Sequence, residues 1–375
     1  MGGAESFLLN LLTASEELRR RSVIASLSFG SGDLPSRLRQ IGATVVELPK
    51  ARVREPVGLA RTLLSLRRLV RTWGIRVIVG NGAHPQIVGG LAARLTGTRS
   101  VFLVNMIHSY PLLSNQYLDA LALRGPCDLM LAISKASRAT LERLRPTVPT
   151  RLYYWGTPLP QVPAEAGPRA RDELGVGQND VLLGSFGRLQ RWKGQDVFVA
   201  AAGEVARARP QSRFVVVGGS VFGLEPEYFE GIRHDAEALG LGDRIRFTGF
   251  RTDVPALMSA CDVVCHTSRV PEPFGLVIVE AMAVGRPVIA TQGGGPSEMI
   301  ESPSEGVLVP PDDRRALAAA MIALIDDPQR RRALGARGAA LVRERFSIET
   351  AASNLVAHLN DALAEVRLDA LATAG

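Results

Sequence analysis

Short apolar segments alternate with amphipathic segments along most of this 375-residue chain. The alternation predicts parallel β-sheets covered by helices, because parallel neighbours need crossover connections that are usually helical. In the first half, the strands are expected at Val23–Phe29, Thr44–Leu48, Val77–Gly80, Val101–Val104 and Leu129–Ile133. The helices expected around them are Ser6–Arg20, Pro56–Thr72, Gln86–Leu95 and Lys135–Leu144.

The same pattern restarts after a proline-rich segment, Pro158–Pro168, which has the composition of a hinge. The strands expected after it are Val181–Phe186, Phe214–Val217, Arg246–Thr248, Asp262–Cys265, Val288–Ala290 and Val307–Val309. The chain is therefore expected to form two Rossmann-like, doubly wound α/β domains, residues 1–160 and 161–349. In such folds a ligand cleft is expected at the carboxyl ends of the strands, between the domains.

Composition narrows the class of protein. A hydrophobic content of 46% with 22% charged residues is typical of a soluble globular chain. Cys261 and Cys265 lie in apolar runs without a metal-binding spacing, so we expect them to be core residues in a reducing compartment. The net charge of +7 favours anionic partners. A nucleic-acid binder is disfavoured, because the basic residues are dispersed and aromatic residues make up only 5%.

The first residues, MGGAESFLLNLL, resemble the tight loop between a strand and a helix, where backbone N–H groups face an anion. No strand precedes Gly2 and Gly3, although a Rossmann-type sheet normally has a strand there. We expect either that the natural start lies upstream or that the sheet is built around a gap. The alternative for the two glycines is a frayed terminus.

Two cations follow the first strand of the second half, in the segment GSFGRLQRWKGQD. Gly187 permits a turn after Phe186, and Arg188 and Lys193 would then project from the carboxyl edge of the sheet. A guanidinium and an ammonium there could hold a diphosphate. The alternative is a solvated basic loop, but Lys193 is one of only three lysines, with Lys50 and Lys135, which favours a specific role.

Two acids bracket the apolar run of the segment EPFGLVIVEAM, namely Glu272 and Glu280. A helix N-terminus near Phe274 and Gly275 would offer free N–H groups beside Glu272. Carboxylates accept hydrogen bonds from the paired hydroxyls of a ribose or a hexose. The alternatives are that Glu272 caps the helix and that Glu280 pairs with an arginine. Gly-rich segments at 215–220 and 291–300 strengthen the case for a nucleotide pocket.

Together these stretches resemble the donor domain of the retaining glycosyltransferases of family 4, whose pattern is G-R-x(4)-K-G followed by E-x-F-G-x(4)-E-A-M-A-x-G-x-P-V. The resemblance implies the GT-B fold, with a first N-terminal strand missing and a C-terminal helix, 350–375, that packs on the N-terminal domain. It implies an acceptor-binding role for residues 1–160 and donor binding by 161–349. The catalytic residues that it implies are Arg188, Lys193, Glu272 and His108. The donor-binding residues that it implies are Gly2, Gly3, Gly187, Phe250, Arg251, Phe274, Gly275, Leu276 and Glu280.

The implied reaction moves a hexose-type sugar, with retention, from a UDP- or GDP-sugar to a hydroxyl acceptor in glycan, glycolipid or polysaccharide synthesis. Arg188 and Lys193 would neutralise the diphosphate, Glu280 would hold the ribose, and Glu272 would hold the transferred sugar. Phe250 and Arg251 would flank the base. No metal is expected, since the sequence has no Asp-x-Asp pair. The alternatives are a sugar-nucleotide binder that has lost catalysis and a GT-B epimerase.

The acceptor side is less defined. Residues 52–73 carry six arginines beside leucine-rich positions, which suits contact with an anionic membrane that carries a lipid-linked acceptor. The alternative is the solvated face of a core helix. We expect a cytoplasmic protein with a peripheral position on the inner face of the plasma membrane, because no apolar run is long enough to span a bilayer.

Overall fold

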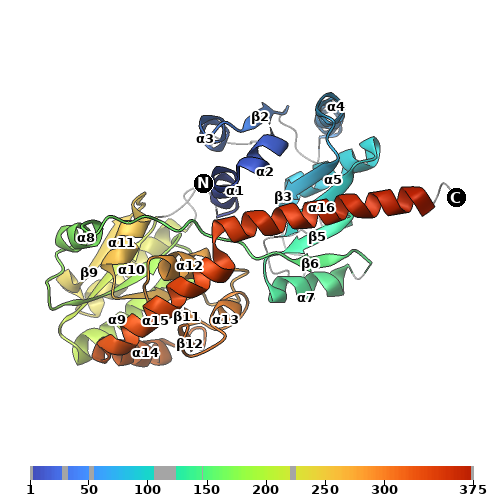
Figure 1. Ribbon diagram of the computed structural model, residues 1–375. Helices are drawn as coiled ribbons and strands as arrows, with labels where there is room; N and C mark the ends of the chain where they lie inside the picture. The colour runs from blue at the N-terminus through green and yellow to red at the C-terminus, as the bar shows by residue number, and fades with distance from the viewer. Residues whose placement is uncertain are drawn as a thin grey trace. The chain divides into compact units, whose positions relative to one another are not determined.

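A computed structural model describes residues 3–27, 33–49, 55–104, 124–145, 147–219 and 225–372. The chain divides into two compact units (Figure 1). One unit comprises Met1–Gly156 and Ile348–Gly375, and the other comprises Thr157–Ser347. The last helix, α16 (Ile348–Ala372), belongs to the first unit, where it contacts α1 (Gly3–Ala14).

The N-terminal unit contains two parallel sheets instead of one. The strands are β1 (Val23–Ser26) and β2 (Thr44–Glu47) in the smaller sheet, and β3 (Val77–Asn81), β4 (Arg99–Val104), β5 (Leu129–Ala132) and β6 (Thr150–Leu152), in that order, in the larger one. Within the described residues β1 pairs only with β2, and β3 pairs only with β4. Among the described strands, the pairing is therefore interrupted between the two sheets.

One apolar cluster joins the two sheets of this unit. Its buried members are Leu48, Leu66, Val88 and Ala92, and residues of both β1 and β3 pack against it. The helices around the sheets are α1, α2 (Glu16–Arg21), α3 (Leu34–Gln40), α4 (Pro56–Trp73), α5 (Ala83–Thr96), α7 (Lys135–Leu144) and α16. Burial of one face of these helices holds the interrupted sheets together.

Two element boundaries differ from the prediction. The single helix expected over Ser6–Arg20 is wrong, because the chain breaks between α1 and α2 at Ser15, whose hydroxyl accepts a hydrogen bond from the Leu18 N–H and caps α2. The first strand ends at Ser26, and the end predicted for it at Phe29 lies outside the described residues.

The C-terminal unit has one six-stranded parallel sheet in the order β12-β11-β10-β7-β8-β9. Its strands are β7 (Val181–Phe186), β8 (Ser212–Val217), β9 (Ile245–Gly249), β10 (Val263–His266), β11 (Val288–Thr291) and β12 (Val307–Val309). The main helices are α8 (Ala166–Leu174), α9 (Gln195–Ala208), α10 (Pro226–Ala238), α11 (Val254–Ala260), α12 (Leu276–Ala283), α13 (Pro296–Met299), α14 (Arg314–Asp326) and α15 (Pro328–Leu341). The hinge expected over Pro158–Pro168 is shorter than predicted, since α8 begins at Ala166.

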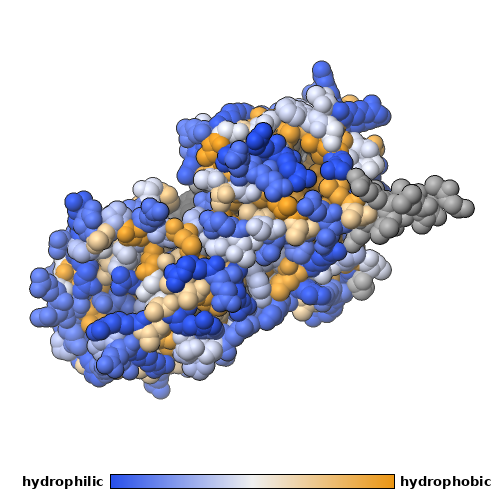
Figure 2. All heavy atoms as spheres, viewed as in Figure 1, coloured by the Kyte–Doolittle hydropathy of each residue, from blue (hydrophilic) through white to orange (hydrophobic). Residues whose placement is uncertain are grey.

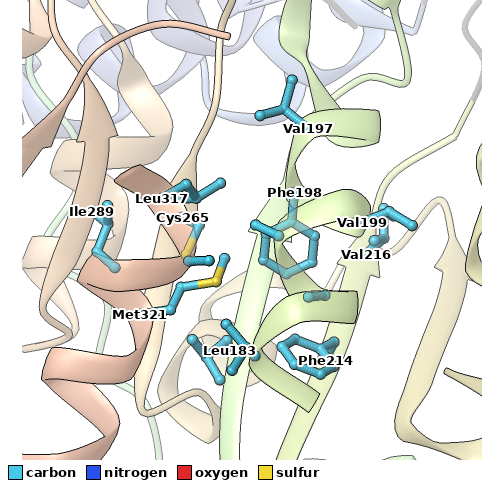
Figure 3. Packing of buried hydrophobic residues seen from close by; sticks show 14 of the residues in the cluster. Leu183, Val197, Phe198, Val199, Phe214, Val216, Cys265, Ile289, Leu317 and Met321 are labelled. Carbon is cyan, nitrogen blue, oxygen red and sulfur yellow. The ribbon is translucent and has the colours of Figure 1, made fainter. Parts of the chain in front are cut away.

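The core of this unit explains why the apolar runs form central strands. Figure 3 shows Phe198 of α9 facing the sheet, with Leu183 of β7, Cys265 of β10 and Met321 of α14 in the same cluster. The ring of Phe198 meets that of Phe214 edge to face at 6.2 Å. Cys265, like Cys261, is fully buried and not bonded to another cysteine, which confirms the prediction that both are core residues.

Candidate functional site

The strand order places the carboxyl ends of β7 and β10 side by side. The chain runs from β7 outward to β8 and β9, and then returns to the other side of β7 with β10. At such a reversal the loops that leave the two neighbouring strands diverge and open a crevice, where doubly wound folds bind ligands. The segments that carry Arg188 and Lys193 and those that carry Glu272 both start there.

The loop after β7 is held by a backbone hydrogen bond and by the side chain of Gln195. Gly187 has φ = +134°, a conformation that only glycine adopts easily, and its N–H donates to the Val217 carbonyl. The Gln195 amide donates to the Arg188 carbonyl at 2.9 Å. The Arg188 side chain is exposed and makes no hydrogen bond or ion pair with another described residue, so its guanidinium is available to an anion.

The loop after β10 supports the other end of this segment. The Thr267 hydroxyl donates to the Lys193 carbonyl at 3.1 Å, and the Arg269 N–H donates to the Trp192 carbonyl at 2.8 Å. Gly194 follows with φ = +67°, and a Cβ there would lie 2.1 Å from the Thr267 carbonyl oxygen. The two loops are therefore packed backbone against backbone, which sets the position of Lys193.

Glu272 lies at the centre of a buried polar cluster. Its Oε2 accepts hydrogen bonds from Lys193 Nζ at 2.5 Å and from Ser268 Oγ at 3.0 Å, and it lies 3.3 Å from His266 Nε2. Burial raises the pKa of Glu272, but the charge of Lys193 and the hydrogen bonds from His266 and Lys193 outweigh burial and lower the pKa well below its usual range. Glu272 is therefore ionised, and it is held by Lys193 instead of capping a helix.

The segment after Glu272 packs against the glycine-rich loop that follows β11. Phe274 is 2% exposed, with its ring 6.0 Å from that of Phe346, so only its backbone can face a ligand. The Gly295 N–H donates to the Glu272 carbonyl at 2.8 Å, and a Cβ at Gly295 would lie 2.1 Å from the Phe274 carbonyl oxygen. Gly295 therefore serves backbone packing that presents the Glu272–Gly275 segment.

The helix α12 begins at Leu276, after Gly275 in the left-handed conformation at φ = +99°. Its first N–H groups have no carbonyl partner within the helix. Glu280 lies further along α12, is partly buried, and has no hydrogen bond or ion pair with another described residue. The alternative that Glu280 pairs with an arginine is therefore wrong for this part of the chain. Burial raises its pKa to about 7.

The two residues expected to flank a base differ in their surroundings. Phe250 directly follows β9, is 79% exposed and lies against the Gly218–Gly219 turn. Arg251 instead donates from Nη2 to Glu173 at 3.0 Å and from Nε to Asp253 at 2.8 Å. Phe250 thus offers an aromatic face, whereas the guanidinium of Arg251 already binds two carboxylates.

Three of the expected residues belong to the N-terminal half of the chain, and sequence analysis did not identify two residues of the cluster. Gly2 and His108 lie outside the described residues. Gly3 is the first residue of α1 in the N-terminal unit. His266 and Ser268 were missed, although the polar run CHTS at the end of a buried strand and just before EPFG was a usable signal.

Comparisons with known proteins agree with this geometry. Residues 168–340 match the sequence profile described as "Glycosyl transferases group 1", and residues 1–159 match the profile "Glycosyltransferase Family 4". The chain is 34% identical over 190 residues to the lipopolysaccharide core biosynthesis mannosyltransferase LpsB of Rhizobium meliloti, covering 50% of this chain and 54% of LpsB. It is 36% identical over 209 residues to a D-inositol 3-phosphate glycosyltransferase of Salinispora tropica, covering 54% of this chain and 43% of that protein. The chain thus spans about half the length of the curated relatives that it matches.

The fold is also found in solved structures. Anabaena HepE, determined with UDP and glucose, superposes with a TM-score of 0.83 at 29% identity, over 96% of both chains. The two doubly wound units and the site at the β7–β10 strand ends define a GT-B protein. With both halves matched by their profiles, the chain belongs to glycosyltransferase family 4.

Proposed function

We propose that this chain is a retaining glycosyltransferase that moves a hexose-type sugar from a nucleotide-diphosphate sugar to a hydroxyl acceptor. The observation that carries the proposal is the cluster at the β7–β10 strand ends. There Arg188, which is exposed and has no hydrogen bond or ion pair from its side chain to another described residue, lies on the same loop as Lys193, and the ammonium of Lys193 binds the ionised Glu272. Cations suit a diphosphate, and an ionised acid suits the hydroxyls of a sugar.

In this proposal different residues bind different parts of the donor. Arg188, Lys193 and the N–H groups at the start of α12 stabilise the charge that develops on the leaving diphosphate. Glu272 and the backbone of Phe274 and Gly275 orient the transferred sugar. The acceptor oxygen attacks from the face that the diphosphate leaves, and a phosphate oxygen takes the acceptor's proton. The sugar–acceptor bond therefore forms on the same face from which the sugar–phosphate bond breaks.

The nucleotide end is assigned to Glu280 and Phe250. Glu280 has no partner of its own among the described residues, and ribose hydroxyls would supply hydrogen bonds to its carboxylate. Phe250 supplies an exposed ring beside the Gly218–Gly219 turn for a base to stack on. HepE was determined with UDP-glucose, which makes UDP-sugars the first donors to test.

For the acceptor we propose a hydroxyl of a growing glycan or of a lipid-linked sugar. The matched relatives are named for lipopolysaccharide core and inositol phosphate glycosylation. Helix α4 supports a membrane-borne acceptor, since it exposes Val57 and Leu64 beside arginines at positions 61, 67, 68 and 71. On the face drawn in Figure 2, hydrophilic and hydrophobic residues are both exposed around α4. Within the described ranges no helix is long and apolar enough to cross a membrane.

A thermal-shift screen over UDP- and GDP-sugars tests the donor. A bound donor should raise the melting temperature, because a ligand that binds only the folded state stabilises it. Lys193→Ala should abolish the shift, since it removes one of the two cations that would bind the diphosphate. Lys135→Ala, which replaces a lysine of the N-terminal unit, should leave the shift intact. An unchanged shift and turnover in Lys193→Ala would refute the proposal.

A sugar-nucleotide binder without catalysis remains the second candidate, because the described strands of the N-terminal unit, which would bind the acceptor, pair in two separate sheets instead of one. The two functions differ in turnover. A transferase releases the nucleoside diphosphate in proportion to the acceptor that is added, whereas a binder releases none. An epimerase would instead convert the donor in the absence of any acceptor.

A further inference from the structure

The ammonium of Lys193 faces Glu272 and not open solvent. Nζ lies 2.5 Å from Oε2 of Glu272, and the two side chains are 16% and 11% exposed. Under the proposed function, on which this inference rests, Lys193 serves the diphosphate and Glu272 serves the sugar. The ion pair between Lys193 and Glu272 must therefore separate when the donor binds.

Breaking a buried pair is costly unless the remaining charge keeps other partners. Glu272 has two. Ser268 Oγ donates to Oε2 at 3.0 Å, and His266 Nε2 lies 3.3 Å from the same oxygen. His266 and Ser268 also contact each other at 3.1 Å, so that both side chains are fixed around Oε2. The contacts described for this carboxylate all use Oε2, which leaves Oε1 to a ligand.

The hydrogen-bonding role of His266 follows from the atom that it faces. Nε2 lies 3.3 Å from Oε2 of Glu272, and a carboxylate oxygen only accepts, so Nε2 must be the donor in this contact. Ser268 Oγ donates to the same oxygen at 3.0 Å. His266 and Ser268 therefore both act as donors to Oε2.

We propose that His266 and Ser268 are positioning residues for a partner exchange at Glu272. In the structure Lys193 is bound to Glu272. When a diphosphate draws Lys193 away, His266 and Ser268 keep the Glu272 carboxylate hydrogen-bonded and oriented, with Oε1 turned to the sugar. Glu272 thus competes with the diphosphate for Lys193. The hydrogen bond from His266 to Glu272 lowers the free energy that is needed to separate Lys193 from Glu272.

Chemical labelling tests the closed pair without any ligand. An ammonium bound to a carboxylate keeps its proton and acylates slowly. The chain has only three lysines, so the rates at Lys193 and Lys135 can be followed together by mass spectrometry during acetylation with acetic anhydride. Glu272→Gln should accelerate acetylation of Lys193 several-fold and leave Lys135, the internal control, unchanged. An unchanged Lys193 rate would overturn the inference.

A double-mutant cycle tests the exchange of partners at Glu272. The affinity for UDP and for GDP, measured by calorimetry, reports how well the protein binds a diphosphate. Glu272→Gln should tighten nucleotide binding by roughly three- to tenfold, because Lys193 is released. His266→Ala should weaken it by a similar factor, and His266→Gln, which retains an N–H donor, should restore most of the loss. In the Glu272→Gln background, His266→Ala should have no effect, because no buried carboxylate is left to support.

A purely structural role for His266 gives a different result: His266→Ala would then weaken binding equally in both backgrounds, and the proposal would be wrong. His234→Ala, at an exposed histidine of α10, controls for the loss of a histidine and should change nothing. The absence of any nucleotide binding by the wild-type protein would refute the proposed function. Nucleotide binding combined with an unaltered Lys193 acetylation rate would refute the exchange alone.

Discussion

Glu272 and Glu280 are eight residues apart and have opposite electrostatic environments. Both are desolvated, which raises the pKa of each. Glu272 has Lys193 and His266 to offset burial, so it stays ionised. Glu280 has no such partners among the described residues, so its pKa rises to about 7. The difference between the two acids is therefore a difference in neighbours, not in residue type.

Glu280 predicts a pH dependence of nucleotide binding. As pH rises through about 7, its carboxyl group loses its proton and becomes a stronger hydrogen-bond acceptor for ribose hydroxyls. We expect UDP affinity to rise about fivefold more between pH 6 and pH 8 in the wild type than in Glu280→Gln, a gain of about 1 kcal/mol. Calorimetry on both proteins separates this effect from titration of the nucleotide itself, and parallel profiles would contradict it.

The same group predicts how stability changes with pH. A carboxyl whose pKa is raised from 4.5 to about 7 binds its proton more tightly in the folded state than in the unfolded chain. Its stabilising effect is complete below pH 4.5 and is lost as pH rises through about 7. Glu280→Gln should therefore melt at a higher temperature than the wild type at pH 8, with a smaller difference at pH 5. The reverse order would show that the carboxylate has a partner.

Replacing Gly194 by alanine is expected to lower both the stability of the protein and its affinity for nucleotide. Gly194→Ala would place a methyl group 2.1 Å from the Thr267 carbonyl in a backbone conformation that alanine disfavours. We expect a loss of about 1–3 kcal/mol in unfolding free energy, with weaker nucleotide binding because the Lys193 loop must move. Urea unfolding and calorimetry measure the two effects.

Gly231 offers the matched control. It lies inside α10, where a Cβ would meet nothing within 4 Å. Gly231→Ala should stabilise the protein by about 0.5–1 kcal/mol, because alanine loses less backbone entropy than glycine in a helix. Equal losses in the two variants would show that the contact with Thr267 is not the cause at Gly194.

At the scale of elements, helix α4 predicts membrane recruitment. Leu64 is 63% exposed and lies on the helix surface among Arg67, Arg68 and Arg71, an arrangement suited to an anionic bilayer. Vesicles with a high content of phosphatidylglycerol should sediment the protein at low salt, and zwitterionic vesicles should not. Equal amounts in the supernatant with and without anionic vesicles would exclude this role.

A charge variant separates α4 from the overall positive charge of the chain. Arg67→Gln combined with Arg71→Gln should reduce sedimentation several-fold, since each basic residue near the surface contributes about 1 kcal/mol. Arg330→Gln combined with Arg332→Gln, at exposed positions of α15, removes the same charge elsewhere and should have little effect. A similar loss in both variants would indicate only non-specific attraction.

Most elements of the fold could be predicted from the chain because their signals are local. Apolar runs bounded by polar loops predicted β7 and β10, and amphipathic repeats predicted α4 and α7. The break at Ser15 was missed, since the apolar pattern continues across it and only the cap geometry shows that two helices are present. Local patterns predict where an element lies more reliably than where it ends.

At the scale of the whole molecule, the sequence predicted two doubly wound units. For the N-terminal unit it left open whether the natural start lies upstream or the sheet is built around a gap, and the described strands of that unit pair as sheets of two and four. The cluster Leu48, Leu66, Val88 and Ala92 keeps both parts in one core. Such packing between segments distant in sequence depends on shape and cannot be deduced from periodicity.

The sequence by itself determined the α/β architecture, and its motif indicated that Arg188, Lys193 and Glu272 follow strand ends and that Glu280 lies on the next helix. Both could be predicted because they depend on the spacing of residues that are close together in the sequence. Only the tertiary structure decided which of these groups already has a partner. Lys193 is held by Glu272, Arg251 is held by Glu173 and Asp253, and Arg188 remains open to an anion. Two charged residues that form an ion pair can be tens of residues apart in the sequence. Whether they come within hydrogen-bonding distance depends on how their loops pack, which local spacing does not specify.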